Sequence, residues 1–515
     1  MHFDHWLAAC LIPIALWVLL SGLDDLFIDL VFTFSRDRFP WPADRELTHA
    51  PQRRIAVFVP LWHEHQVIGK MLRNNLAAVR YGNYDIFVGV YPNDRLTVEA
   101  VRTVAHEDPR VHLAFCPHDG PTSKGDCLNW AYRAMVEYER RTGIDFEIIV
   151  THDAEDVIDR ESLLLINWFS RDYEMVQIPV LPLATGWNEW THGVYCDEFA
   201  EYQLKDIPVR RRLGGFLPSN GVGTGFERTA LESLHRENDG RIFDPACLTE
   251  DYENGFRIHQ AGYRQIFVPI RMAEKRPLAT REYFPRTRRA AIRQRSRWVA
   301  GITLQGWERH GWRGSAKQIY WFWRDRKGLA GNLISPLANL VFLYWAASLI
   351  GHRESSPLLP VVQLPFWLKE VCLVSIGISV LQAGFRIQLS SRIYGARFAA
   401  AAPIRILWAN LINGAATVQA IRQFGTAKLR KRALAWIKTE HVYPSVAAAS
   451  TAPPRLGEVL IDLQLISEAD LEDALRQKRK GQRIGECLVG MGKITEEHLS
   501  IALQWQSGTV LTSGD

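Results

Sequence analysis

The run IAVFVP, residues 55–60, is the stretch that decides the fold. It is one of three short apolar runs, and the others are IFVGVY at 86–91 and IIVTHD at 148–153. Runs of this length between polar residues are typical of buried strands, and helical stretches separate them. Strands that alternate with helices predict a largely parallel sheet with helices on both faces. Ligands bind beyond the carboxyl ends of such strands, where each run reaches polar or acidic residues.

Charge and cysteine content exclude some functions for this chain of 515 residues. The net charge of +5 is close to neutral for this length, which argues against general binding of nucleic acid polymers. The seven cysteines include no C-x-x-C pair, so neither a zinc site nor a disulfide framework is indicated. The 18 tryptophans and 23 phenylalanines are typical of proteins whose aromatic rings lie at a membrane interface.

Long apolar stretches flank the predicted α/β domain. The stretch from His5 to Leu23 approaches the roughly 20 residues that cross a bilayer, and no basic residue precedes it, so we interpret it as a retained helix and not a signal peptide. Gly328 to Gly351 predicts a second crossing, and residues 355–368 with 371–385 predict one return crossing plus an interfacial piece. Residues 406–421 predict a re-entrant or surface-lying helix or, equally well, a further span. Basic residues after the first stretch place the N-terminus outside and the α/β domain in the cytoplasm.

A small duplicated domain ends the chain. Residues 444–454, PSVAAASTAPP, are typical of a flexible linker. The motif RLGEVL that begins at Arg455 recurs 28 residues later as RIGECL, beginning at Arg483. Hydrophobic residues that follow each motif recur at the same offset, which indicates an internal duplication over residues 455–506.

Asp153-Ala154-Glu155 directly follows the third apolar run. Carboxylates at positions i and i+2 can converge on Mg²⁺ or Mn²⁺, and such an ion would neutralise a diphosphate leaving group. An isolated pair of this kind is more often a solvated acidic turn. The tripeptide therefore needs support from other motifs.

Two further motifs lie closer to the second apolar region. Thr249-Glu250-Asp251 precedes a helical stretch and offers either a general base for an acceptor hydroxyl or an ordinary helix N-cap. The run QRSRW at 294–298 combines an amide, a cation and an aromatic ring, or forms a basic interfacial helix. Three fixed residues match by chance about once in 8,000 positions, so the order of several motifs carries more weight than any one of them.

With these motifs in this order, residues 51–301 resemble the family-2 inverting glycosyltransferases, in particular the processive membrane branch of cellulose, chitin and hyaluronan synthases. The resemblance implies a GT-A fold, a UDP-sugar donor and metal-dependent growth of a polysaccharide. It implies Asp251 as the catalytic base and Asp153 with Glu155 as metal ligands, and it leaves open whether Asp156 replaces Glu155 in that site. The implied donor contacts are Pro60, Glu64, Asp94, Lys124 and Asp153, and the implied acceptor or pyrophosphate contacts are Gln294, Arg297 and Trp298.

The duplicated domain resembles the N-terminal domain of type II secretion and pilus ATPases, a module that binds cyclic di-GMP. The resemblance implies cyclic di-GMP as an allosteric activator, and a helical docking module without nucleotide is the alternative. The run WIKTEH at 436–441 resembles the gating loop that covers the donor site in related synthases, or else ends a basic interfacial helix. The residues implied are Arg455, Gly457, Gln477, Arg483, Gly485 and Gln506 for cyclic di-GMP, and Lys438, Thr439 and His441 for the gating loop.

The order of the parts is similar to that of the bacteriophage adsorption B family of inner-membrane glycosyltransferases. The similarity implies a multi-pass protein of the bacterial inner membrane, with its catalytic and C-terminal domains in the cytoplasm. It also implies export of an exopolysaccharide, with an outer-membrane export or receptor partner. Two other functions stay open, namely the loading of one sugar onto a lipid phosphate and a phage-receptor or scaffold role with weak activity. The expected parts are an N-terminal transmembrane segment at 1–35, the glycosyltransferase domain at 51–301, interfacial and transmembrane helices at 302–443, a linker at 444–454 and the duplicated domain at 455–506.

Overall fold

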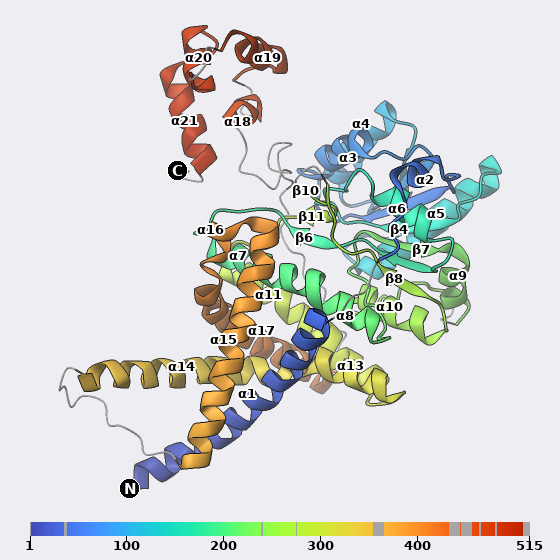
Figure 1. Ribbon diagram of the computed structural model, residues 1–515. Coiled ribbons are helices and arrows are strands. Elements are labelled where there is room, and N and C mark those ends of the chain that lie inside the picture. Colours follow the sequence, from blue (N-terminus) through green and yellow to red (C-terminus); the bar gives the residue numbers. More distant parts are fainter. Residues whose placement is uncertain are drawn as a thin grey trace.

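The computed structural model has three parts, which are an α/β domain, a set of long helices beside it and a small helical unit that stands apart (Figure 1). The central sheet has seven strands in the order β3-β2-β1-β4-β7-β5-β8, and β7 is antiparallel to both of its neighbours. The prediction of a mostly parallel sheet is therefore confirmed. The structure describes residues 2–34, 39–237, 240–273, 276–353, 365–431, 443, 456–462, 465–478 and 482–507.

The elements of the α/β domain follow one another as alternating strands and helices. The strands of the central sheet are β1 Ile55–Pro60, β2 Tyr84–Val90, β3 Val111–Phe115, β4 Ile148–Thr151, β5 Met175–Gln177, β7 Thr224–Glu227 and β8 Gln265–Phe267. Two short sheets pair β6 Val180–Pro182 with β11 Thr280–Glu282 and β9 Met272–Ala273 with β10 Arg276–Pro277. The helices are α2 Asp44–His49, α3 Ile68–Ala78, α4 Arg95–Glu107, α5 Lys124–Thr142, α6 Ser162–Phe169, α7 Trp190–Glu201, α8 Ile207–Arg212, α9 Arg228–Glu237, α10 Glu250–Gln260, α11 Arg288–Trp298, α12 Gly306–His310 and α13 Ala316–Arg326, with π-helical turns η1 Tyr202–Asp206 and η2 Val299–Gln305.

Strand β1 lies at the centre of two hydrophobic clusters, one on each face of the sheet. Ile55, Val57 and Val59 point to one face and belong to a cluster with residues of α3, α4 and α6. Ala56 and Phe58 point to the other face and belong to a cluster with residues of α5 and α9. Because side chains alternate along a strand, an uninterrupted apolar run such as IAVFVP fits a strand covered by helices on both faces.

The three apolar runs of the sequence are adjacent parallel strands. Phe58 of β1 pairs with Phe87 of β2 on one side and with Thr151 of β4 on the other. The carboxyl ends of β2, β1 and β4 therefore meet at one edge of the sheet, where the predicted donor-binding residues follow.

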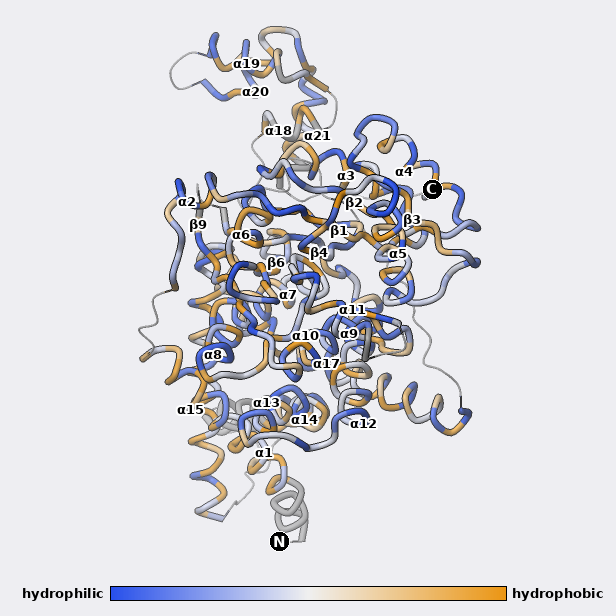
Figure 2. Tube along the Cα trace, turned by 90° about the vertical axis from the view of Figure 1, so that its right-hand side faces the viewer, coloured by the Kyte–Doolittle hydropathy of each residue, from blue (hydrophilic) through white to orange (hydrophobic). Residues whose placement is uncertain are grey.

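Four long helices pack beside the α/β domain, α1 His2–Phe34, α14 Gly328–Arg353, α15 Phe366–Tyr394 and α17 Ala402–Leu429. Two segments, Leu11–Phe34 and Phe366–Tyr394, are long and apolar enough to cross a membrane, and Gly328–Val341 is a shorter apolar segment. Figure 2 shows hydrophobic residues recurring along α15, which packs along α1. Helix α15 runs unbroken through Lys369 and Glu370, although residues 354–364 of the predicted return crossing lie outside the described residues. The stretch 406–421 lies within α17, which packs on α7, α11 and α14.

Buried ion pairs join α7 and η1 to three of the long helices. Arg405 of α17 donates from Nε to Asp197 of α7 at 2.6 Å. Glu201 pairs with Lys205 at 2.7 Å and with Arg386 of α15 at 2.6 Å. Lys205 also reaches Asp29 of α1 at 2.6 Å. We name these three carboxylates and three cations the ionic joint: Asp29, Asp197, Glu201, Lys205, Arg386 and Arg405.

The C-terminal unit repeats one pair of helices. Its helices are α18 Leu456–Asp462, α19 Glu468–Gln477, α20 Ile484–Gly490 and α21 Glu496–Ser507. Equivalent residues of the two repeats, such as Leu460 and Leu488, share one hydrophobic cluster. A Cβ at Gly457 would lie 2.6 Å from a methyl carbon of Leu471, and one at Gly485 would lie 2.5 Å from Leu499. Both glycines of the repeated motif therefore allow close packing between helices inside the unit.

Candidate active site

A lysine and an aspartate meet at the carboxyl edge of the central sheet. Asp153 follows β4, and Lys124 is the first residue of α5. The Nζ atom of Lys124 lies 2.6 Å from one carboxylate oxygen of Asp153 and 2.8 Å from the other. Burial alone would lower the pKa of Lys124, but the carboxylates of Asp153, Glu250 and Asp251 outweigh it and raise that pKa. Lys124 is thus a permanent cation at this edge of the sheet.

Glu155 and Asp156 face different surroundings. The Asp156 side chain is buried, pairs with Nδ1 of His152 at 2.7 Å and accepts a hydrogen bond from the backbone N–H of Asp153 at 3.0 Å. These contacts use Asp156 to shape the loop after β4. Glu155 instead lines a large cavity together with Asp153. The sequence left Glu155 and Asp156 open as the second metal ligand beside Asp153, and the geometry favours Glu155.

Two more carboxylates enter the cavity from the start of α10. Thr249 occupies the N-cap position, and Glu250 and Asp251 are the first two helical residues. One carboxylate oxygen of Asp251 accepts the backbone N–H of Tyr252 at 2.7 Å. Burial raises the pKa of Asp251, with Lys124 offsetting part of the effect, and burial together with the charge of Asp251 raises the pKa of Glu250 to about 7. Raised values of this kind suit proton transfer near neutral pH.

A glycine leaves the space that Asp251 occupies. Gly221, in the loop before β7, has φ +76°, a left-handed conformation that L side chains rarely adopt. A Cβ atom there would lie 2.6 Å from Oδ2 of Asp251. The backbone of this loop therefore sets the position of the Asp251 carboxylate.

The sequence motifs missed a fifth carboxylate. Glu282, at the end of β11, lines the same cavity, and burial followed by the charges of Glu155, Asp156 and Asp153 raises its pKa well above the ordinary value. Its only sequence signal was an acidic residue after the short run PLATR. From the carboxylates that line the cavity we name five the acidic floor: Asp153, Glu155, Glu250, Asp251 and Glu282.

Helix α11 brings the remaining motif to the cavity. Gln294, Arg297 and Trp298 line it, and the charge of Arg297 acts on both carboxylates at the start of α10. The indole of Trp298 packs edge-on against the ring of Tyr195, with centroids 6.1 Å apart. Arg295 has a different role, because it pairs with Glu198 at 2.8 Å and donates to Asn413 of α17 at 2.6 Å.

The loop after β1 forms the opposite wall. Pro60, Trp62 and Glu64 line the cavity, and Trp62 meets the ring of Tyr91 edge-on at 5.4 Å between centroids. Asp94 is buried and accepts the backbone N–H of His63 at 2.6 Å, so its carboxylate holds this loop onto the start of α4. Trp62 and Tyr91 were not singled out from the sequence, although Tyr91 directly follows β2 and Trp62 lies two residues after the end of β1.

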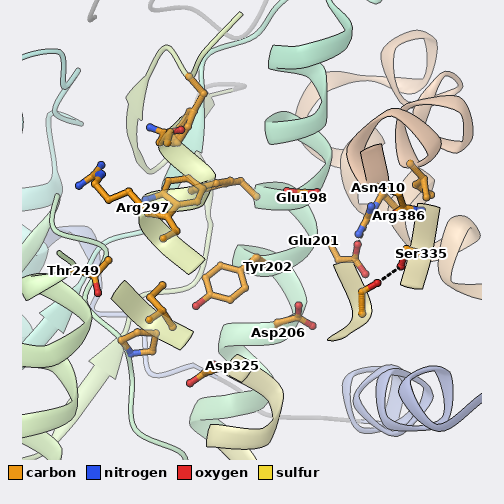
Figure 3. A pocket seen from close by; sticks show the side chains of 18 of the residues that line it. Glu198, Glu201, Tyr202, Asp206, Thr249, Arg297, Asp325, Ser335, Arg386 and Asn410 are labelled. Carbon is orange, nitrogen blue, oxygen red and sulfur yellow. Dashed lines mark hydrogen bonds and ion pairs between the residues drawn. The ribbon is translucent and has the colours of Figure 1, made fainter. Parts of the chain in front are cut away.

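The cavity extends from the acidic floor to the long helices and has a volume of about 1760 Å³. Figure 3 shows Thr249 and Arg297 on one side, Tyr202 and Asp206 between, and Ser335, Arg386 and Asn410 on the far side. The far walls combine hydroxyl and amide groups with apolar side chains of α1, α14, α15 and α17. Helices far apart in the chain build this continuity, so short motifs do not predict it.

Comparison with known proteins decides the family. Residues 51–301 match the family described as "Glycosyltransferase like family 2". The chain is 37% identical over 532 aligned positions to bacteriophage adsorption protein B of Escherichia coli (strain K12), which covers 98% of this chain and 71% of that protein. The bacteriophage N4 adsorption protein B of Escherichia coli O157:H7 gives the same figures. The chain belongs to the bacteriophage adsorption protein B family. It is a glycosyltransferase-family-2 protein.

Among solved structures, the mannosyltransferase PcManGT from Pyrobaculum calidifontis, in complex with GDP-Man and Mn²⁺, matches with a TM-score of 0.46 and 18% identity. The match covers 77% of this chain and 99% of that structure.

The acidic floor has the chemistry of a metal site that a diphosphate completes. Asp153 and Glu155 both line the cavity and offer hard oxygen ligands. Mg²⁺ is commonly held by one or two protein carboxylates together with substrate phosphates. Within the described residues, no group of three or more His, Cys, Asp or Glu side chains is arranged to hold an ion alone. The residues present therefore fit an ion that binds with the donor.

The structure brings most of the sequence-predicted site residues together. Pro60, Glu64, Lys124 and the acidic floor line one cavity with Gln294, Arg297 and Trp298. In the C-terminal unit, Arg483 is exposed at the N-cap of α20 and Gln477 is exposed in α19. Gln506 lies in α21. Asp94, a predicted donor contact, is described but is not among the residues that line the cavity. Arg455 of the cyclic di-GMP motif and Lys438, Thr439 and His441 of the gating loop lie outside the described residues.

Proposed function

We propose that the protein is a metal-dependent, inverting glycosyltransferase that polymerises the sugar of a UDP-sugar donor into an exopolysaccharide. The observation that carries this proposal is the continuity of one cavity from the acidic floor to the long helices. A chain that grows at Asp251 can lie in this cavity while its new end stays beside the donor. The polar groups on the far walls supply hydrogen-bond partners for sugar hydroxyls.

In the proposed reaction, the acceptor hydroxyl oxygen attacks the anomeric carbon of the donor sugar. The bond between that carbon and the diphosphate oxygen breaks, and the hydroxyl proton passes to the Asp251 carboxylate. The buried position and raised pKa of Asp251 support the role of base. Gln294, Arg297 and Trp298 line the cavity beside it and would orient the acceptor.

Lys124, together with a metal ion bound by Asp153 and Glu155, would hold the leaving diphosphate. A bound Mg²⁺ or Mn²⁺ supplies charge neutralisation to that group. Asp153 and Glu155 would hold the ion, and Lys124 would turn from Asp153 toward a phosphate oxygen while keeping its charge. Trp62 offers a flat surface for the nucleoside base, next to Glu64.

A second candidate is the transfer of one sugar onto a lipid phosphate. The observation that favours it is the apolar part of the cavity lining, which includes Leu11, Ile14 and Val18 of α1 and Val380 of α15. A lipid tail would fit these side chains. The same walls also carry the hydroxyl and amide groups of Ser335, Asn339 and Asn410, which suit sugar hydroxyls better than a lipid tail, so we favour the polymer.

Reconstituted full-length protein separates the two candidates. We expect release of UDP from one or a few UDP-sugars in the presence of Mn²⁺ or Mg²⁺, together with a carbohydrate product of many residues. A product that carries one sugar and partitions with lipid would refute polymer synthesis and support transfer onto a lipid phosphate. Absence of UDP release from every UDP-sugar tested would leave the phage-receptor or scaffold role.

The setting proposed for this reaction is the bacterial inner membrane, with the catalytic and C-terminal domains in the cytoplasm. The two segments long enough to cross a membrane support this location. A polymer exported from there needs a passage through the outer membrane, so we propose an outer-membrane export or receptor partner. Protease digestion of spheroplasts tests the orientation, because a cytoplasmic α/β domain stays uncut until the cells are lysed.

We further propose that cyclic di-GMP activates the enzyme through the C-terminal unit. The exposed guanidinium of Arg483, repeated in sequence as Arg455, supports contacts with phosphate or with the guanine edge. Calorimetry on the full chain is expected to detect cyclic di-GMP binding that Arg483→Ala weakens. A wild-type chain without measurable binding would leave the unit as a docking module.

A further inference from the structure

A buried tyrosine lies in the segment between α17 and the C-terminal unit. Within residues 432–455 the structure describes Tyr443, which is 9% exposed and belongs to the same hydrophobic cluster as strands β1 and β4. Its hydroxyl oxygen accepts a hydrogen bond from Nδ2 of Asn74 in α3 at 2.7 Å. The segment is therefore fixed to the α/β domain at this residue.

The next residue of α3, Asn75, supports the loop that carries Asp153 and Glu155, the two proposed metal ligands. Nδ2 of Asn75 donates to the backbone carbonyl of Asp156 at 2.8 Å, and the backbone N–H of Ile158 donates to Oδ1 of Asn75 at 3.0 Å. Asn75 is 2% exposed. The Asn75 side chain thus holds the backbone directly after Glu155 through two hydrogen bonds. It lies one residue along the helix from Asn74, which contacts Tyr443.

The surroundings of Tyr443 place it beside that loop. Burial is the main effect that raises the pKa of Tyr443 to about 12, and the charge of Asp156 adds to it while Arg281 opposes it. Arg281 exchanges backbone hydrogen bonds with Val157 at 2.8 and 3.1 Å, directly before Glu282 of the acidic floor. Tyr443 therefore lies among the groups that hold the loop from behind.

We propose that Tyr443 is a positioning residue, which fastens the segment leading to the C-terminal unit onto the back of the loop that carries Asp153 and Glu155. Through the paired contacts of Asn74 and Asn75, Tyr443 keeps the spacing of Asp153 and Glu155. The use of metal and donor rests on the proposed function.

The test compares Tyr443→Phe and Tyr443→Ala in the full chain with a matched control, Tyr81→Phe. Tyr81 belongs to the same hydrophobic cluster and donates from its hydroxyl to the carbonyl of Arg53 at 2.6 Å, near the start of β1. Binding of Mn²⁺ in the presence of UDP is measured by electron paramagnetic resonance, and KM for the donor and kcat are measured alongside. We expect the half-saturating Mn²⁺ concentration to rise about 10-fold in Tyr443→Ala and about 3-fold in Tyr443→Phe, with KM raised, kcat within about twofold and Tyr81→Phe unchanged.

Equal Mn²⁺ curves for wild type and Tyr443→Ala would overturn the inference, as would an equal shift in Tyr81→Phe, since that would reflect core packing alone. If the wild type binds no Mn²⁺ with UDP, the proposed function fails, and amide hydrogen exchange decides the positioning role. Faster exchange over residues 153–158 in Tyr443→Phe, but not in Tyr81→Phe, supports the inference. Unchanged exchange there refutes it.

Discussion

The acidic floor and the ionic joint are built from the same residue types but balance their charges differently. In the joint, each carboxylate has a cation within 2.7 Å. In the floor, Asp153, Glu250 and Asp251 act on Lys124, and Arg297 acts on the last two of them. The joint pairs its charges within the chain, whereas the floor holds more carboxylates than cations, and burial raises the pKa of Glu250, Asp251 and Glu282. Buried charge paired within the chain connects elements of structure, and buried charge left in excess indicates a site for a cationic ligand.

The largest expected effect is the loss of turnover when Asp251 of the acidic floor is changed. Asp251→Asn keeps the shape of the side chain but cannot accept the acceptor proton, so the turnover rate should fall by about 10² to 10⁴. A matched control is Asp108→Asn, because Asp108 pairs with Arg110 at 2.6 Å before β3 and away from the cavity. UDP release by both variants is the measurement. A rate within about threefold of wild type in Asp251→Asn would remove this residue as the base.

Substitutions in the ionic joint should lower the stability of the fold and leave donor binding unchanged. Arg405→Met leaves the buried Asp197 carboxylate without its guanidinium partner, which should destabilise the fold by about 3–5 kcal/mol. The double variant Asp197→Leu with Arg405→Met should recover most of this loss, because it removes both charges. Thermal unfolding in detergent measures both effects. Donor affinity of the folded fraction should stay at the wild-type value, and a large change in it would erase the distinction between the two regions.

Glu250 should make stability depend on pH. Its pKa is raised from 4.5 to about 7 in the fold, so its contribution to stability is complete below about 4.5 and is lost as the pH rises through about 7. Glu250→Gln should therefore gain up to about 3 kcal/mol over wild type at pH 8 and almost none at pH 4.5. Thermal unfolding at a series of pH values measures this difference. A gain in stability that does not vary with pH would show that the fold does not raise the pKa of Glu250.

A smaller effect tests how the floor is held in place. Gly221→Ala puts a Cβ atom 2.6 Å from Oδ2 of Asp251 and strains a backbone with φ +76°, so kcat should fall about 10-fold. Gly143→Ala is the control, because Gly143 has φ +72° at the end of α5 and no atom within 4 Å of an added Cβ. Both variants should lose about 1 kcal/mol of stability. Equal rates in the two variants would mean that the glycine loop does not position the base.

The sequence predicted the central strands and most of the acidic floor because both depend on local patterns. The apolar runs that end in Pro60 and Thr151 form neighbouring strands, and the motifs that follow them lie at the shared edge. Glu282 was not predicted, because its place in the floor depends on pairing between β11 and the distant strand β6. The cavity beyond Tyr202 was not predicted either, since four helices from both ends of the chain form it. The repeated glycine of the C-terminal motif was assigned to ligand approach, whereas Gly485 packs against Leu499.

The most direct test of the contrast between floor and joint is Mn²⁺ binding to the purified full-length protein, measured by electron paramagnetic resonance with and without UDP. We expect that UDP promotes Mn²⁺ binding in the wild type, that Asp153→Asn abolishes it, and that the folded fraction of Asp197→Asn retains it. Mn²⁺ binding that is unchanged in Asp153→Asn, or absent from the wild type in the presence of UDP, would contradict the assignment of the acidic floor as the metal and donor site.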